Sequence, residues 1–423
     1  MNRQNCKMSL FIHFQVQIPL LKMIIMLNMS WVLNAQSLTT IDLVQATFEE
    51  IPANRIFEEL KIVPLETHPD GLLNIKYATY YLTDKYIIAI TPITSISFFG
   101  SQERAYLFDR ETGKFIREVS SFGQGPDEYT GFLYGLFGFD EKNNILFVSD
   151  AKYIGESCKG INIETNKVEL IVKKPLNENP NETNMSSAPW LIKENIYVSF
   201  RNNRTGKDKV RLIVYDKDGS IIKRYPNYLE YEKIGGLIPA FNGIFYNYNK
   251  MTYFKEWGYN DTVFCVDEEK MLPHMIFKLG NKQPSYYHQQ DGEYNKGKYL
   301  IYLVNESNSL VLFNFLTIIE TRRGPLGESL ATNSYRHTGY YDKKSKQAYI
   351  SSTPDYKKSG ITIPGLPVNF IPISINNNKE MIAHIDPEEL MKYKNDISSQ
   401  YKHLFQNIQE DDNPIIIIAK IKE

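Results

Sequence analysis

A turn that recurs about every 50 residues constrains the fold of this chain more than any other feature. In its clearest copy, the strand-like residues 104–109 lead into Arg110-Glu-Thr-Gly113, and alternating apolar residues then continue to Val119, which predicts a β-hairpin. Similar segments follow along the chain, each marked by an acidic residue. The six markers are Asp109, Glu164, Asp216, Asp267, Asp342 and Asp386. Their spacings of 55, 52, 51, 75 and 44 residues lie close to the periods of known repeat architectures.

Each marked hairpin is preceded by two further strand-like runs, such as residues 86–90, 144–149 and 195–200. Four short strands per repeat, repeated six times, predict an all-β fold of the six-bladed β-propeller type. A four-stranded sheet alone would leave both apolar faces in water, whereas six sheets around an axis cover one another. Two stacked β-sandwiches are the alternative, but they would not require six equivalent hairpins. The long spacing before Asp342 indicates an insertion near residues 321–328.

Composition supports a folded β protein and excludes some partners. The 29 Tyr and 23 Phe residues suit half-buried strands. The 48 basic and 49 acidic residues nearly cancel, so charge gives no reason to expect a nucleic-acid partner.

The first 35 residues have the pattern of a signal peptide. Basic residues precede an apolar stretch at residues 23–33, and Ala35 offers a small residue for cleavage before the propeller at 36–423. The apolar stretch is too short to span a bilayer, so we expect no transmembrane anchor after cleavage. Met8 is an alternative start, and an unstructured leader on a cytosolic protein is the alternative interpretation.

The cysteines indicate neither lipidation nor a metal site. No cysteine follows the apolar stretch, so the exported protein is expected to be non-lipidated, in the periplasm or at the cell surface. Cys158 and Cys265 could pair in an oxidising compartment, but two cysteines in so long a chain are more often buried and unpaired. Neither has a second Cys or a His at ligand spacing.

The C-terminal region combines a predicted helix with a predicted closing strand. Asp386 and Pro387 suit a helix start, and apolar residues recur at helical spacing over about 387–409. The run Ile415-Ile-Ile-Ile418, within a strand expected at about 414–422, suits a strand that is covered on both faces. We expect it to pair with residues 62–67, because joining the two chain ends in one sheet would close the ring.

Several of these segments together resemble a known family. The carrying pieces are residues 62–67, 108–116, 122–129, 259–264, 365–372 and 411–418, in the family's order. The chain resembles the uncharacterised exported six-bladed β-propeller proteins of Bacteroides and related bacteria, which are distant relatives of NHL- and TolB-like propellers. The resemblance implies the fold and the export, and it brings no assigned activity.

Few residues stand out as candidates for binding or modification. Gly123-Gln-Gly-Pro-Asp-Glu128-Tyr129 could present Glu128 and Tyr129 as ligand-binding residues, although an inter-blade turn explains its glycines more simply. Trp190 and Trp257 could stack on a ligand at a rim, although aromatic residues also suit blade packing. Asp261-Thr262-Val263 resembles the O-glycosylation acceptor motif of such bacteria, with Thr262 modified; a turn that leads into a strand is the simpler account.

No catalytic or metal-binding motif is identifiable in the sequence. The expected function is therefore a binding or scaffolding module whose partner is a small molecule, a glycan or an envelope protein, with enzymatic activity left uncertain. The alternative is a metal-assisted hydrolase or lyase of the lactonase type at the central funnel, with calcium as the expected cofactor. Its ligands would be far apart in the chain, so no local pattern would reveal them.

Overall fold

Short antiparallel sheets make up most of the described chain. The computed structural model describes residues 38–92, 103–121, 123, 125–129, 137–149, 157–175, 187–203, 205–234, 243–324, 328–351, 359–376 and 379–423. The predicted signal peptide, residues 1–35, lies outside them. Residues Thr40–Glu423 form one compact unit.

Six sheets of four or five strands are present among the described residues. The sheets are numbered in chain order, and the strands of each sheet are given from the innermost strand outward. Sheet 1 contains β4 (Thr79–Leu82), β5 (Tyr86–Pro92), β6 (Glu103–Asp109) and β7 (Phe115–Glu118). Sheet 2 contains β8 (Phe137–Asp140), β9 (Ile145–Ser149), β10 (Ser157–Asn162) and β11 (Lys167–Lys173). Sheet 3 contains β12 (Trp190–Lys193), β13 (Ile196–Phe200), β14 (Val210–Asp216) and β15 (Ile221–Pro226).

The other three sheets include strands from the beginning of the described chain. Sheet 4 contains β16 (Gly243–Tyr248), β17 (Met251–Glu256), β18 (Thr262–Val266), β19 (Met271–Lys278) and β1 (Thr39–Asp42). Sheet 5 contains β20 (Tyr299–Glu306), β21 (Leu310–Arg323), β22 (Ser329–Asp342), β23 (Gln347–Ser351) and β2 (Thr47–Glu49). Sheet 6 contains β26 (Ser374–Ile375), β27 (Glu380–Ile385), β28 (Ile415–Ile421) and β3 (Phe57–Pro64). A two-stranded sheet joins β24 (Ile361–Thr362) and β25 (Asn369–Phe370).

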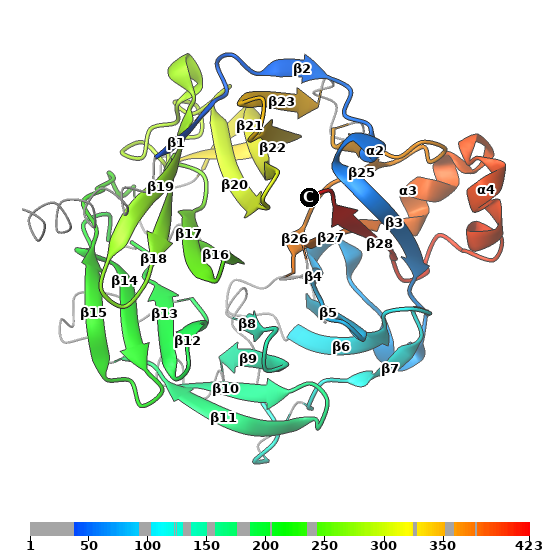
Figure 1. The fold of residues 1–423 in the computed structure, drawn as a ribbon, viewed down its shortest axis with the longest axis horizontal. Helices are drawn as coiled ribbons and strands as arrows, with labels where there is room; N and C mark the ends of the chain where they lie inside the picture. The colour runs from blue at the N-terminus through cyan, green and yellow to red at the C-terminus, as the bar shows by residue number, and fades with distance from the viewer. Residues whose placement is uncertain are drawn as a thin grey trace, which may run out of the picture. The chain divides into compact units, whose positions relative to one another are not determined.

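The six sheets follow one another around a central axis (Figure 1). Six apolar clusters each join two neighbouring sheets, and the last of them joins sheet 6 to sheet 1. Because both faces of each sheet are covered in this way, middle strands carry continuous apolar runs such as Ile87-Ile-Ala-Ile90, which is buried throughout. The predicted all-β propeller fold is confirmed.

The predicted pairing of the two chain ends is also confirmed. β28 pairs antiparallel with β3, so that Ile416 lies opposite Val63 and Ile417 opposite Ile62. Asn413, just before β28, fixes the segment that follows β3. Its Nδ2 donates to the carbonyl oxygens of Glu66 and Gly71, both at 2.8 Å, and its Oδ1 accepts from the Leu73 N–H at 2.9 Å.

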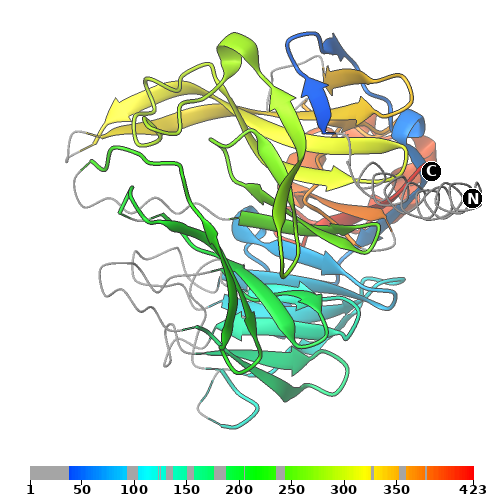
Figure 2. The same ribbon diagram turned by 60° about the vertical axis from the view of Figure 1, so that its left-hand side comes forward.

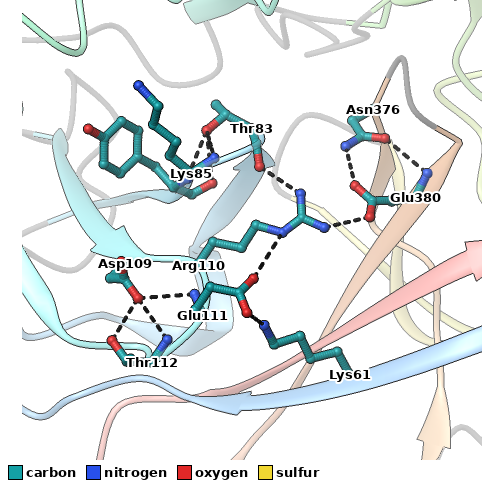
Figure 3. Close-up of polar contacts among 10 residues, drawn as sticks. Lys61, Thr83, Lys85, Asp109, Arg110, Glu111, Thr112, Asn376 and Glu380 are labelled. Atoms are coloured by element: carbon teal, nitrogen blue, oxygen red, sulfur yellow. Dashed lines mark hydrogen bonds and ion pairs between the residues drawn. The ribbon is translucent and has the colours of Figure 1, made fainter.

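Polar side chains also join sheet 1 to sheet 6, next to the paired chain ends (Figure 3). Arg110, in the turn between β6 and β7, forms an ion pair with Glu380 at the start of β27 and donates to the Thr83 carbonyl at 2.8 Å. Asn376 accepts from the Glu380 N–H and donates to its carboxylate, each at 2.9 Å, which fixes the Glu380 side chain.

The marked turns have a shared geometry, although two markers were assigned wrongly. Asp109 Oδ1 accepts from the N–H groups of Glu111 and Thr112, and the carboxylates of Asp216, Asp267 and Asp342 accept from their own turns in the same way. In sheet 2 this place belongs to Asn162, because its amide oxygen accepts from Glu164 N–H; Glu164 is not the turn acid. Asp386 follows the second strand of sheet 6 and begins a helix instead.

The predicted continuous helix over 387–409 is wrong. The segment forms α3 (Pro387–Lys392), η5 (Lys394–Asp396), α4 (Ser399–Lys402) and η6 (His403–Phe405). Tyr393 leaves helical geometry, Ile397 is extended, and the Ser398 N–H bonds to the Gly365 carbonyl at 2.9 Å. The apolar stripe nevertheless packs as expected, because Leu390, Ile397 and Phe405 are buried in the cluster between sheets 5 and 6.

The insertion before Asp342 includes a long hairpin. β21 and β22 are 14 residues each and extend beyond the neighbouring sheets (Figure 2). The predicted insertion at 321–328 lies at the tip of this hairpin, where residues 325–327 are outside the described part. The two described cysteines, Cys158 and Cys265, are buried and are not joined in a disulfide.

Shorter segments complete the secondary structure. Helix α2 (Ala53–Ile56) precedes β3, and η1 (Pro69–Gly71) and η2 (Ile75–Tyr77) lie between β3 and β4. Segment η4 (Gly280–Lys282) follows β19.

Candidate functional site

The main cavity lies along the propeller axis and has a volume of about 1500 Å³. Residues from the innermost strand of every sheet line it. These strands are β4, β8, β12, β16, β20 and β26. Because each sheet presents its first strand to the axis, the cavity wall is assembled from residues far apart in sequence.

Aromatic rings form part of this wall. Trp190 on β12 stacks on Phe245 on β16, with ring centres 5.9 Å apart and an interplanar angle of 22°. The Trp190 Nε1–H donates to Asn247 Oδ1 at 3.4 Å, and the Thr252 hydroxyl donates to the same oxygen at 3.2 Å. This holds the Trp190 ring in place, and Trp190 and Phe245 both remain partly exposed.

A buried carboxylate lies in the wall near sheets 4 and 5. Glu306, at the end of β20, accepts from Lys343 Nζ at 2.6 Å and lies 2.8 Å from His274 Nε2. Burial alone would raise the pKa of Glu306, but the hydrogen bonds and charges of His274 and Lys343 outweigh it and lower the pKa. Glu306 is therefore an anion neutralised from two sides. Its oxygens are engaged by protein groups.

A second pair lies at the boundary between sheets 6 and 1. The rings of Tyr80 on β4 and His384 on β27 are 5.5 Å apart, and both residues line the cavity. The Tyr80 hydroxyl and His384 Nδ1 are buried and have no hydrogen-bond partner within the described part of the chain. Burial raises the pKa of Tyr80 and lowers the pKa of His384 to about 4, so both side chains are neutral at pH 7.

The structure places the predicted residues Glu128 and Tyr129 away from any ligand site that it shows. Tyr129 is fully buried between sheets 1 and 2, where its hydroxyl donates to Glu118 at 3.3 Å. The Glu128 carboxylate folds back onto its own loop and accepts from the Gly125 N–H at 2.6 Å. A Cβ at Gly123 would lie 1.9 Å from that carboxylate and would displace it from this position. The loop is an inter-sheet turn, and neither Glu128 nor Tyr129 is among the residues that line the axial cavity, so their role in ligand binding stays a prediction.

The other predicted residues have different placements. Trp190 and Trp257 both line the axial cavity, so the structure brings them to one site. Thr262 begins β18 and is partly buried; its hydroxyl donates to Asp261 Oδ1 at 2.9 Å. Thr262 lies apart from the cavity-lining residues.

Sequence reasoning missed the groups that only the fold brings together. Glu306 ends β20, His274 lies within β19 and Lys343 follows β22, whereas Tyr80 and His384 come from opposite ends of the chain. The one available signal was the tyrosine pair at 80–81, which begins a strand-like run.

Neither a metal centre nor a membrane helix is present in the part of the chain that the structure describes. There, no group of three or more His, Cys, Asp or Glu side chains is arranged to hold a metal ion. None of the helices described there has the length and apolar character needed to cross a membrane.

Comparison with known proteins finds relatives of the fold. A family model described as a domain of unknown function (DUF4934) matches residues 38–420. A presumed exported protein from Bacteroides fragilis aligns with a TM-score of 0.64 at 16% identity, over 91% of this chain and 100% of its own. A member of the DUF4221 family from Bacteroides vulgatus aligns with a TM-score of 0.50 at 9% identity, over 86% and 99% of the two chains.

More distant structural similarity extends to an enzyme. The periplasmic gluconolactonase of Pseudomonas aeruginosa aligns with a TM-score of 0.38 at 11% identity, over 69% of this chain and 94% of its own, which is too remote to support any argument about activity. No curated protein matches the sequence. At these identities the two Bacteroides structures indicate a shared fold and leave the ligand open.

Proposed function

Because this chain belongs to the DUF4934 family, a family defined by a domain of unknown function, we propose its function from the axial cavity: it is a ligand-binding module. The observation that carries the proposal is a cavity of about 1500 Å³ whose wall combines the stacked Trp190–Phe245 pair with a few polar groups. Ligand sites have this composition, with apolar and aromatic walls and a small number of placed polar atoms.

The fold and the location belong to the same proposal. Each of the six large sheets is one blade, so the protein is a six-bladed propeller related to NHL- and TolB-like propellers. The protein is exported to the periplasm or the cell surface without a lipid anchor. The basic and apolar pattern of residues 1–35 supports export. A cavity enclosed by six inner strands favours a small molecule or a glycan over the flat surface of an envelope protein.

Tryptophan emission offers a direct test of binding in the cavity. Of the three Trp residues, Trp190 and Trp257 line the cavity, and Trp31 lies in the leader. With Trp31→Phe as background, purified protein is titrated with neutral oligosaccharides, acidic oligosaccharides, dipeptides and nucleosides. We expect at least one class to change the emission and to raise the melting temperature, because a molecule that binds only the native state stabilises it.

A pair of variants locates the binding. Trp190→Ala should reduce affinity at least tenfold, whereas Tyr228→Ala, which removes the most exposed ring outside the cavity, should leave it unchanged. A molecule that raises the melting temperature equally in both variants, with no change in emission, would place binding elsewhere. If no class binds, the proposed function is wrong.

A further inference from the structure

The stacked Trp190–Phe245 pair and the Tyr80–His384 pair lie on opposite walls of the axial cavity. Trp190 and Phe245 pack at the boundary of sheets 3 and 4, and Tyr80 and His384 meet at the boundary of sheets 6 and 1. Three sheets separate these two boundaries in either direction around the ring (Figure 1).

The two pairs also lie toward the same end of the cavity. Four antiparallel strands return the chain to the face from which it started, so the innermost strands all begin at the same face. Trp190 is the first residue of β12 and Tyr80 is the second residue of β4. His384 is the fifth residue of β27, which runs in the opposite direction and returns toward that face.

Tyr80 and His384 carry polar atoms that the protein itself leaves unpaired. The Tyr80 hydroxyl and His384 Nδ1 have no hydrogen-bond partner within the described residues, and the same holds for Nδ2 of Asn305, a buried cavity-lining residue on β20. Buried polar atoms in native proteins are nearly always paired, so unpaired atoms in residues that line a cavity indicate partners supplied from the cavity. Tyr80 and His384 are neutral at pH 7, so each can share a hydrogen bond with a hydroxyl without burying a further charge.

One class of ligand satisfies both walls. A saccharide has an apolar face of C–H groups that stacks on aromatic rings, and a rim of hydroxyls that both donate and accept hydrogen bonds. We propose that the axial cavity binds a neutral saccharide, which stacks on Trp190 and Phe245 and reaches Tyr80 and His384 with its hydroxyls. This inference rests on the proposed ligand-binding function.

The size of the cavity indicates an oligomer. Its volume of about 1500 Å³ exceeds the roughly 300–1000 Å³ that is typical of small-molecule sites, so several sugar units can extend from one wall to the other. The Tyr80 hydroxyl and His384 Nδ1 are covered, so the saccharide contacts them only after a ring rotation that uncovers these atoms.

The test separates ligand binding from stability. Tyr80→Phe removes only the unpaired hydroxyl, so the free protein should keep or raise its melting temperature, while affinity for a neutral oligosaccharide should fall about tenfold. The matched control is Tyr215→Phe, another fully buried tyrosine, whose hydroxyl is paired with Ser199 Oγ at 2.7 Å. This control should lower the melting temperature and leave saccharide affinity unchanged.

The probes are a malto-, a cello- and a xylo-oligosaccharide, with an oligogalacturonate as the acidic arm. Binding of each probe is measured by calorimetry and by Trp emission in the Trp31→Phe background. Binding of only the acidic arm, or only of dipeptides or nucleosides, overturns the saccharide inference and leaves the proposed function standing. If Tyr80→Phe binds the saccharide as tightly as the unchanged protein, the Tyr80–His384 pair is not part of the binding site. No binding in any arm overturns both.

Discussion

At the scale of single residues, the hairpin turns share one hydrogen-bond arrangement, although different side chains provide it. An acceptor at the first turn position binds the N–H groups that follow, and a residue three or four positions later has positive φ. That residue is Gly113, Asn166, Gly219 or Lys346 in the turns that begin at Asp109, Asn162, Asp216 and Asp342. Only acidic residues were used to mark the acceptors in the sequence, so Asn162 was missed. An amide oxygen accepts these hydrogen bonds as well as a carboxylate does.

Gly113 has a second constraint that Gly219 lacks. Both have positive φ, but a Cβ at Gly113 would lie 2.0 Å from the backbone oxygen of Pro64 on β3, whereas at Gly219 the nearest atoms are 3.3 Å away. Gly219→Ala should therefore lower the free energy of unfolding by about 1 kcal/mol from backbone strain alone. Gly113→Ala should cost about 3 kcal/mol, because β3 must also move. Urea unfolding of both variants measures the difference, and equal losses would contradict the close approach.

Glu103 makes a prediction about pH. It is 3% exposed, its Oε2 has no partner within the described chain, and burial raises its pKa to about 7 from 4.5. The folded state therefore binds this proton more tightly, and stability from this group is lost as pH rises from about 4.5 to 7. Glu103→Gln removes the buried charge, so relative to the unchanged protein it should gain up to about 3 kcal/mol at pH 8 and little at pH 4.5.

The measurement for Glu103 is urea unfolding at the two pH values. Glu50→Gln, at an exposed position, is the control, and it should change the free energy of unfolding by the same small amount at both pH values. A Glu103→Gln effect that is the same at pH 4.5 and pH 8 would show that the carboxyl is not desolvated in the folded protein.

At the scale of elements, the reliability of sequence prediction depended on how local the signal was. The closing strand was predictable because four consecutive isoleucines suit only a strand covered on both faces, and residues 62–67 offered a matching partner. The helix over 387–409 was predicted as continuous because periodicity measures which side chains are buried. It does not register the contact of Ser398 N–H with Gly365 that interrupts the helix.

Asn413 joins the two chain ends at the element scale and can be tested alone. Asn413→Ala leaves the Glu66 and Gly71 carbonyls and the Leu73 N–H without their side-chain partner, which should lower the free energy of unfolding by about 3 kcal/mol. Asn143→Ala is the matched control, because that exposed amide bonds only to Asp140 in its own turn, and it should cost less than about 1 kcal/mol. Similar losses in both variants would mean that Asn413 does not hold the ends together.

At the scale of the whole molecule, the axial cavity is a product of the ring. Trp190 and Trp257 could be proposed from sequence because tryptophans are rare in this chain, but their shared location depends on the order of the sheets. The burial of Tyr129 between two sheets could not be predicted, because a glycine-rich loop has the same local sequence whether its tyrosine points outward or fills such a boundary. Glu306 and His384 gave no local signal, since each is an ordinary strand residue until the ring closes, and the tyrosine pair at 80–81 did not reveal which ring faces the axis.

The closure itself gives the last prediction. Lys420 on β28 lies opposite Glu59 on β3, and both side chains are exposed. Directly opposed residues in antiparallel strands have Cβ atoms close enough for a disulfide, so Lys420→Cys with Glu59→Cys should form one under oxidising conditions. The link would join almost the whole chain into one loop, which restricts the unfolded state and should stabilise the fold by about 6 kcal/mol in the chain-entropy account.

Thermal unfolding of the double variant, oxidised and then reduced, measures this stabilisation without changing any other residue. The buried Cys158 and Cys265 should not interfere, and each single-cysteine variant serves as a control. If the ring opens at the β28–β3 pair when it unfolds, the oxidised protein must melt at a higher temperature and lose that gain on reduction. A disulfide that forms fully and leaves the melting temperature unchanged would contradict the prediction that a covalent link between the chain ends stabilises the propeller.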